Sequence, residues 1–197
     1  MRYGRERKAL TRDRVLREAA AAIRVDGPDR LGVAALMGRA GLTHGGFYAH
    51  FGSKDDLLEH ALDYTFEDAF LTFFMDTELR DARAVLSEYV DFYLSAEHRD
   101  GRERGCPIPI LAGEAHRMPV RTRERFSAGL TLMREQLAVL LERAAIPDAA
   151  ERANSALAEM VGAISMARAS APGAAECILR AARRSVREKL DIVDGDA

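Results

Sequence analysis

The sequence predicts an all-α protein with a small N-terminal unit of three helices and a larger helical body. Apolar residues recur at helical spacing along almost the whole chain, and no alternating pattern bounded by turn residues indicates a strand. With 197 residues, of which 48% are hydrophobic, the chain can bury a substantial core. We expect about nine helices, divided between domains 1–52 and 53–197.

Turn and capping residues delimit the first two helices. Thr11 is a suitable N-cap for a helix whose apolar residues share one face, and the Asp-Gly-Pro sequence at 26–28 stops that helix. A short second helix, 33–40, is expected to end at Gly41, because glycine tolerates the left-handed conformation found after helices.

A third helix is predicted over residues 44–50, with Thr43 as its N-cap. Ser53 and Asp56 then form a capping box ahead of an apolar run, which predicts a long fourth helix. No long linker separates the two domains, so this fourth helix is expected to join them directly.

The body is predicted to consist of further helices of about 15 to 25 residues, separated by turn-forming sequences. These sequences lie near residues 76–81, 100–109, 118–119, 146–147 and 172–173.

Composition restricts the environment of the chain. No uncharged apolar run is long enough to span a bilayer, and the N-terminus lacks the apolar segment of a signal peptide, so we expect a cytoplasmic protein without membrane contact. Cys106 and Cys177 are far apart and form no CxxC motif. Neither a disulfide framework nor a metal site is indicated, and no cofactor is expected.

Charge is distributed unevenly although the net charge is only -2. Residues 1–54 hold 11 lysines and arginines against five acidic residues, whereas the remainder holds 18 against 26. A basic N-terminal unit on an acidic body suggests contact with a polyanion. An ordinary solvated helix face is the alternative.

The segment 33–50 has the pattern of a helix-turn-helix, whose second helix enters the major groove of DNA. Gly45 and Gly46 weaken that helix, but they would let its backbone approach the duplex closely. Apolar residues of the motif, Phe47 and Phe51 above all, are expected to pack inward. The remaining side chains are candidates for phosphates and base edges, namely Thr43, His44, Tyr48 and His50, with Lys54 and the exposed amides of the next helix beside them.

Residues 11–62, and most clearly the stretch VAALMGRAGLTHGGFYAHFGSKDDLL, resemble the TetR family of bacterial transcriptional regulators. By this resemblance Thr43, Tyr48, His50 and Lys54 match positions that contact the sugar-phosphate backbone, and His44 and Gly45 match positions that face base edges. Residues 2–8 resemble the flexible arms that some members extend into an adjacent groove.

Two positions depart from the family pattern. Gly32 stands where a serine or threonine usually caps the second helix, so one phosphate contact is missing. Pro28 stands where an aromatic residue often follows the glycine of the first turn.

The resemblance also implies a body that forms a homodimer and binds a small-molecule effector. Two helical faces are candidates for the dimer contact, with an intramolecular core as the alternative. They comprise Met160, Val161, Ile164, Arg168, Ile178, Leu179, Ala182 and Val186.

Aromatic and methionine residues of the body are candidates for a hydrophobic effector pocket, although such residues also fill ordinary cores. The candidates are Phe66, Phe70, Phe73, Tyr89, Phe92, Tyr93, Cys106, Met118, Phe126 and Met133.

Cys106 has a second interpretation. Pro107 suits the first position of a helix, which would make Cys106 its N-cap, and nearby Arg102 and Arg104 would favour a reactive thiolate. Cys106 is therefore a candidate oxidant or electrophile sensor, or else a small packing residue.

Three functions compete at this point. The first is a homodimeric repressor that binds a pseudo-palindromic operator in double-stranded DNA and is released by a small hydrophobic or aromatic ligand. The second is a cysteine-dependent helical enzyme, for which no nucleotide-binding, metalloprotease or hydrolase motif is present. The third is an architectural DNA-binding protein without an effector.

Overall fold

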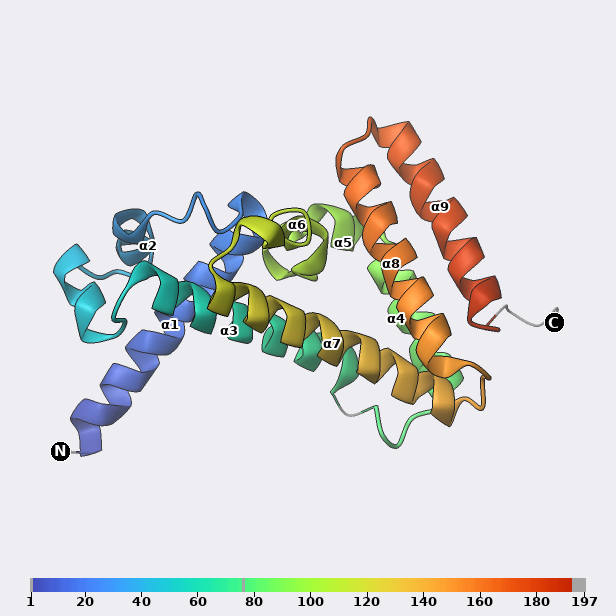
Figure 1. Ribbon diagram of the computed structural model, residues 1–197, viewed down its shortest axis with the longest axis horizontal. Helices are drawn as coiled ribbons and strands as arrows, with labels where there is room; N and C mark the ends of the chain where they lie inside the picture. Colours follow the sequence, from blue (N-terminus) through green and yellow to red (C-terminus); the bar gives the residue numbers. More distant parts are fainter. Residues whose placement is uncertain (1, 76, 193–197) are drawn as a thin grey trace.

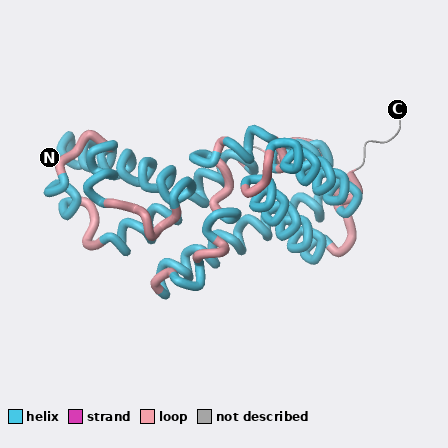
Figure 2. The backbone as a smooth tube through the Cα atoms, turned by 90° about the horizontal axis from the view of Figure 1, so that it is seen from above, coloured by secondary structure: helices cyan, strands magenta, loops and turns pink. Residues whose placement is uncertain are grey.

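A computed structural model describes residues 2–75 and 77–192, and the side chains of residues 2–5, 44 and 72 lie outside this description. The all-helical prediction is confirmed, since the described ranges contain helices and loops without a strand (Figures 1 and 2). The elements are α1 (Arg2–Asp26), α2 (Val33–Arg39), the 3-10 helix η1 (His44–Ala49), α3 (Lys54–Phe74), α4 (Ala82–Tyr93), α5 (Ala96–Asp100), η2 (Arg102–Arg104), α6 (Ile108–Leu111), η3 (Ala115–Arg117), α7 (Val120–Arg143), α8 (Ala149–Arg168) and α9 (Pro172–Lys189).

Helix α1 begins earlier than the sequence pattern predicted. It starts at Arg2 rather than after Thr11, whose hydroxyl donates to the carbonyl of Arg7 within the helix (2.8 Å). The expectation of a flexible arm over residues 2–8 is therefore wrong. The segment is rich in arginine and lysine, which favour helix, and it contains no proline, so nothing stops the helix from extending.

The turn of the helix-turn-helix lies where it was predicted. Gly41 has φ +69°, the left-handed conformation that glycine adopts without strain, and the amide of Leu42 closes the turn on the carbonyl of Met37 (2.8 Å). The following segment, His44–Ala49, is a 3-10 helix and not the predicted α-helix. Two adjacent glycines weaken α-helical continuation, and tighter 3-10 turns are common in such short connections.

Helix α3 joins the N-terminal unit to the body. Its capping box forms: the Ser53 hydroxyl accepts from the Asp56 amide (3.0 Å), and the Asp56 carboxylate accepts from the Gly52 amide (2.8 Å). Helix α3 packs on α1 and also runs beside α7 (Figure 1).

The breaks predicted in the body are observed, but the stretch between them from α4 to η3 is more divided than expected. Helix α4 has 12 residues, α5 has five and α6 only four. Helices α8 and α9 form an antiparallel pair at the end of the molecule remote from α2 (Figure 1). Among the residues described, no helix combines the length and the apolar character that crossing a membrane requires.

A buried arginine fixes the end of α1 on the body. The Arg24 side chain, with the residue only 3% exposed, donates to the carbonyls of Glu103 (2.8 Å) and Thr65 (3.0 Å) and to the Asp68 carboxylate (2.7 Å). Arg102 donates in turn to the carbonyl of Val25. The N-terminal unit is thus attached through both α3 and the end of α1.

Gly129 permits α3 and α7 to pack closely. A Cβ atom at this position would lie 2.2 Å from the buried ring of Phe66, which also contacts Phe126 at 5.8 Å between centroids. We expect Gly129→Ala to lower the free energy of unfolding by about 1–3 kcal/mol in urea denaturation, the usual effect of overpacking.

Gly38→Ala in α2 is the matched control, because a Cβ there has no described neighbour within 4 Å. The control is expected to gain up to about 1 kcal/mol from helix propensity. Equal effects of the two substitutions would contradict this account of the α3–α7 contact.

Candidate nucleic-acid interface

Two phenylalanines hold η1 against the rest of the N-terminal unit. Phe47 and Phe51 are buried and their rings lie 5.7 Å apart, in one cluster with Leu36 and Met37 of α2. Their inward orientation agrees with the sequence interpretation. The short helix η1 is therefore anchored by apolar contacts, which leaves its other side for a partner.

The outer side of η1 carries the predicted contact residues. Thr43, Gly45 and Tyr48 are exposed, and the Tyr48 ring rests edge-on against Phe47 at 5.2 Å. The side chain of His44 lies outside the described part of the structure.

No contact within the described chain requires the two glycines of η1. A Cβ atom at Gly45 would meet no described atom within 4 Å, and one at Gly46 would touch only Met37 and Thr43, both at 3.8 Å. Their φ values lie outside the left-handed region. The absence of a side chain at Gly45 therefore serves neither packing nor backbone strain, which favours close approach by an external molecule.

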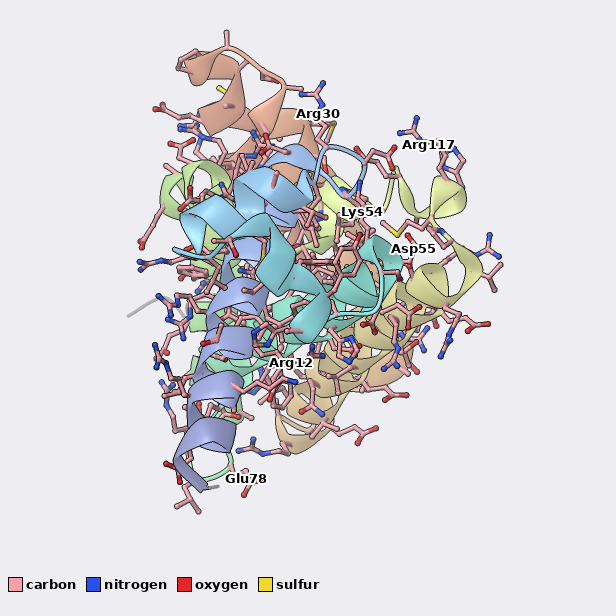
Figure 3. The ribbon with its side chains drawn as sticks, turned by 90° about the vertical axis from the view of Figure 1, so that its left-hand side faces the viewer. Arg12, Arg30, Lys54, Asp55, Glu78 and Arg117 are labelled. Atoms are coloured by element: carbon pink, nitrogen blue, oxygen red, sulfur yellow. The ribbon has the colours of Figure 1, made fainter. Side chains whose placement is uncertain are left out.

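Arg12 supports the candidate interface, a role that sequence reasoning missed. Its guanidinium donates to the carbonyl of His50 (2.6 Å) and lies 4.3 Å from the centroid of the Phe51 ring. This cation–π contact and hydrogen bond fix the end of η1 on α1. Figure 3 faces this end of the molecule and shows Arg12 on α1 and Lys54 at the start of α3.

A basic pocket of about 300 Å³ lies between α1 and the end of η1, lined by Arg7, Lys8, Thr11, Ala49 and His50. Burial, and then the positive charges of Lys8 and Arg12, lower the pKa of His50 below its ordinary value. This concentration of positive charge suits a phosphate group. Sequence reasoning placed Lys8 in a flexible arm, but the helical extension of α1 holds it beside η1.

The start of α3 is less open to phosphate than predicted. Lys54 donates to the carbonyl of Asp29 at 3.4 Å, and two acidic residues, Asp55 and Asp56, share its helical turn. The amide of Asp56 already donates to Ser53. The expectation that the amides of this helix are available is wrong for Asp56, because the capping box occupies it.

The body contains two pockets lined by predicted effector residues. Phe73, Tyr89 and Phe92 line one of about 280 Å³, and Phe92 also lines a second of about 560 Å³ beside α5 and η2. Phe73 is central to the first, with ring centroids 5.3 Å from Tyr89 and 5.2 Å from Phe92. The other candidates line neither pocket and lie in or against the core, namely Phe66, Phe70, Tyr93, Cys106, Met118, Phe126 and Met133.

Cys106 does not have the environment expected of a reactive thiolate. The residue is buried, and burial raises the pKa of its thiol despite the neighbouring Tyr93 hydroxyl. The N-cap of α6 is Pro107, one residue later than predicted. The thiolate expectation is wrong because the fold covers this side chain, which the local sequence does not reveal.

His98 is a second residue that sequence reasoning missed. Its Nε2 accepts from the Cys106 amide (3.0 Å), so Nδ1 donates to the Tyr93 carbonyl (2.7 Å), and the ring is neutral. Burial lowers the pKa of His98 to about 4. This histidine holds the loop before α6 against the end of α4. No group of three or more His, Cys, Asp or Glu side chains in the described ranges could hold a metal ion.

Most side chains predicted for a dimer contact are engaged within their own chain. Met160, Ile164, Leu179, Ala182 and Val186 are buried, chiefly by packing of α8 on α9. This corrects their assignment, because a side chain already covered by its own chain cannot be the contact surface.

The other three dimer candidates are half-buried: Val161, Ile178 and Arg168, the last donating to the carbonyls of Arg99 and His98. The outward faces of α8 and α9 carry the small residues Ala158, Gly162, Ala174 and Ala181, and α9 also exposes Glu176, Arg180, Arg184 and Glu188.

Comparison with known proteins identifies relatives of the same architecture. Residues 15–61 match the sequence profile of the family described as "Bacterial regulatory proteins, tetR family". No curated protein is significantly similar in sequence. A TetR transcriptional regulator from Chloroflexus aurantiacus J-10-FL is 29% identical over 97% of each chain, with a TM-score of 0.78.

Two further TetR-family structures share the fold at lower identity. The regulator from Agrobacterium tumefaciens is 21% identical over 90% of this chain and 98% of its own, with a TM-score of 0.76. The regulator from Cytophaga hutchinsonii is 18% identical over 97% and 98%, with a TM-score of 0.78.

Substitution of Gly45 tests the interface. We expect Gly45→Ala to leave the free energy of unfolding unchanged or higher, because its Cβ has room, but to weaken binding to DNA by about tenfold, the equivalent of one good contact. Gly38→Ala is the control within the same domain and should bind as the wild type does. Fluorescence anisotropy with labelled duplex measures both, and equal affinity of the two variants would contradict the assignment of η1.

Stability is expected to depend on pH through His98. The pKa of His98 in the folded protein is about 4, below the ordinary 6.5. Between these two pH values His98 is therefore protonated in the unfolded chain and neutral in the folded one. The stabilisation is complete above pH 6.5 and is lost as pH falls towards 4, by up to roughly 3 kcal/mol. In urea denaturation, the free energy of unfolding of His98→Gln should lack this fall between pH 6.5 and 4. His116→Gln, a substitution of an exposed histidine, should still show it.

Proposed function

The chain belongs to the TetR family of bacterial regulatory proteins, and from this premise we propose that it is a homodimeric repressor released from its operator by a small-molecule effector. Its N-terminal unit is the DNA-binding domain. The observation that carries the proposal is the exposed side of η1. A Cβ atom at Gly45 would contact no described atom, while the buried Phe47 and Phe51 anchor the opposite side of the helix.

Positive charge on either side of η1 supports DNA as the partner. The pocket formed with Arg7 and Lys8 flanks one side, and Lys54 flanks the other. Contacts of this kind position a protein on the phosphate backbone, while η1 is left to read base edges in the major groove. Thr43 and Tyr48 are exposed beside Gly45 and are proposed to contact the backbone.

The small residues on the outward faces of α8 and α9 support a dimer. Ala158 and Gly162 on α8, with Ala174 and Ala181 on α9, would let two copies of this helix pair approach closely and form a four-helix contact. Such a dimer would present two η1 helices to successive major grooves, about 34 Å apart.

The pockets of the body support release by a small molecule rather than an architectural role. Effector binding would favour a dimer whose η1 helices no longer match the operator spacing, which shifts the population away from the DNA-bound form. A thiol sensor has less support, since Cys106 is buried and the pKa of its thiol is raised.

Selection of bound duplexes from a random library tests this function. The recovered sequences should contain an inverted repeat with half-sites about one helical turn apart, and they should bind at least about 10³-fold more tightly than random duplex at physiological salt. Affinity should fall steeply with added salt, as expected for several phosphate contacts.

Ala158→Arg should give a monomer by analytical ultracentrifugation and lose most affinity, because it places a charge in the proposed contact. Ala128→Arg, on the exposed side of α7, is the matched control and should remain dimeric. Equal affinity for selected and random duplexes would refute the proposal.

A further inference from the structure

Two arginines of the body, Arg102 and Arg168, line the same pocket. This pocket of about 320 Å³ lies between α5 and the junction of α8 with α9, and its charged lining residues are Arg99, Asp100, Arg102 and Arg168. Arg102 also lines the larger pocket of about 560 Å³, so its side chain lies where the two pockets adjoin. Figure 1 shows α5 and α6 between the end of α1 and helix α8.

The hydrogen bonds of these two arginines go to backbone carbonyls and not to carboxylates, although Asp100 interacts electrostatically with Arg168. Arg168 donates to the carbonyls of Arg99 (3.0 Å) and His98 (3.1 Å), and Arg102 donates to the carbonyl of Val25. Within the described ranges neither forms an ion pair with a carboxylate. The nearby Asp100 carboxylate instead accepts two hydrogen bonds from Arg99, each 2.7 Å.

Two further observations indicate that this charge is available to a ligand. Burial, and next the positive charge of Arg102, lower the pKa of Arg168. The Nε of Arg102 is buried and has no hydrogen-bond partner among the described residues. A buried donor is ordinarily paired, so the unpaired Nε of Arg102 beside the half-buried guanidinium of Arg168 favours a bound anion.

We propose that this pocket binds the anionic group of the effector, a carboxylate or a phosphate held between Arg102 and Arg168. The inference rests on the proposed function and specifies the chemistry of its ligand. The larger pocket is lined by Val25 and Phe92 but also by the acidic residues Glu97, Asp100 and Glu103, so it suits the uncharged remainder of the molecule.

The same arginine connects the pocket to the DNA-binding domain. Val25 lies in the last turn of α1, the helix whose Arg12 holds η1. The Val25 carbonyl attracts the Arg102 guanidinium only through its dipole, whereas an anion attracts it through a full opposite charge, so an anion can compete with that carbonyl for Arg102. Loss of that hydrogen bond would leave the end of α1 held by Arg24, whose own acceptors include the carbonyl of Glu103, the residue next to Arg102. A change at Arg102 could therefore reach α1, and through α1 the helix η1.

Binding of charged and neutral aromatic probes tests the site. The full-length protein is titrated with benzoate, phenyl phosphate and the neutral benzamide by calorimetry at constant ionic strength. At least one of the two anions should bind, whereas benzamide should not. If benzoate binds more tightly the preferred group is a carboxylate, and if phenyl phosphate binds more tightly it is a phosphate. Binding of benzamide as tight as that of both anions would overturn the proposal.

Three variants assign the binding to the arginines. Arg102→Gln should lower the affinity for the anion by about tenfold or more, as expected for loss of a hydrogen bond between charged groups. Arg102→Lys keeps the positive charge and should retain part of the affinity for the anion. This partial binding would show that Arg102→Gln loses affinity through the missing charge and not through misfolding. Arg134→Gln, at an exposed arginine of α7, should bind as the wild type does. Undiminished binding by Arg102→Gln would overturn the assignment.

Release from DNA is measured with the duplex obtained by selection. The bound anion should lower affinity for that duplex in the wild type and much less in Arg102→Gln. If specific DNA binding exists but neither anion binds, this inference fails and the proposed function stands. If no specific DNA binding exists, the proposed function fails whatever the anions do.

Discussion

The buried guanidinium of Arg24 is the interaction on which the relation between the two domains depends. It reaches α3 through the Thr65 carbonyl and Asp68, and it reaches the loop before α6 through the Glu103 carbonyl. A buried charge with fewer partners would be costly, so these segments are held in one arrangement around it. The end of α1 therefore cannot shift without disturbing contacts of the body.

The DNA-binding domain combines a rigid support with a weak helix. Phe47, Phe51 and the Arg12 guanidinium fix η1 from one side, while Gly45 and Gly46 deprive it of helix propensity. Tertiary anchoring thus compensates for local instability, and the exposed backbone gains access to a partner. Local rules are often broken in this way where a residue serves binding rather than folding.

The segment from α5 to α6 is also ordered by tertiary contacts of particular side chains. Neutral His98 orders it through two backbone hydrogen bonds, and Gly105 permits the close contact, since a Cβ there would lie 2.9 Å from the His98 ring. Arg168 donates to a carbonyl of α5, whereas Arg102 donates to a carbonyl of α1, and neither forms an ion pair with a carboxylate in the described ranges. Order in this segment thus comes from neutral His98 together with the guanidinium groups of Arg24 and Arg168.

The sequence by itself determined the helical class, the helix-turn-helix, the Ser53 cap and the inward position of Phe47 and Phe51, because each depends on residues a few positions apart. Only the tertiary structure revealed the roles of Arg12, Arg24 and Arg102, whose acceptors include backbone carbonyls on distant segments, and every residue type carries such a carbonyl. It likewise decided that Cys106 is covered and that Met160 and Ile164 face their own chain. Burial is set by which distant helices meet, and a helical stripe has the same pattern whether it packs within one chain or between two.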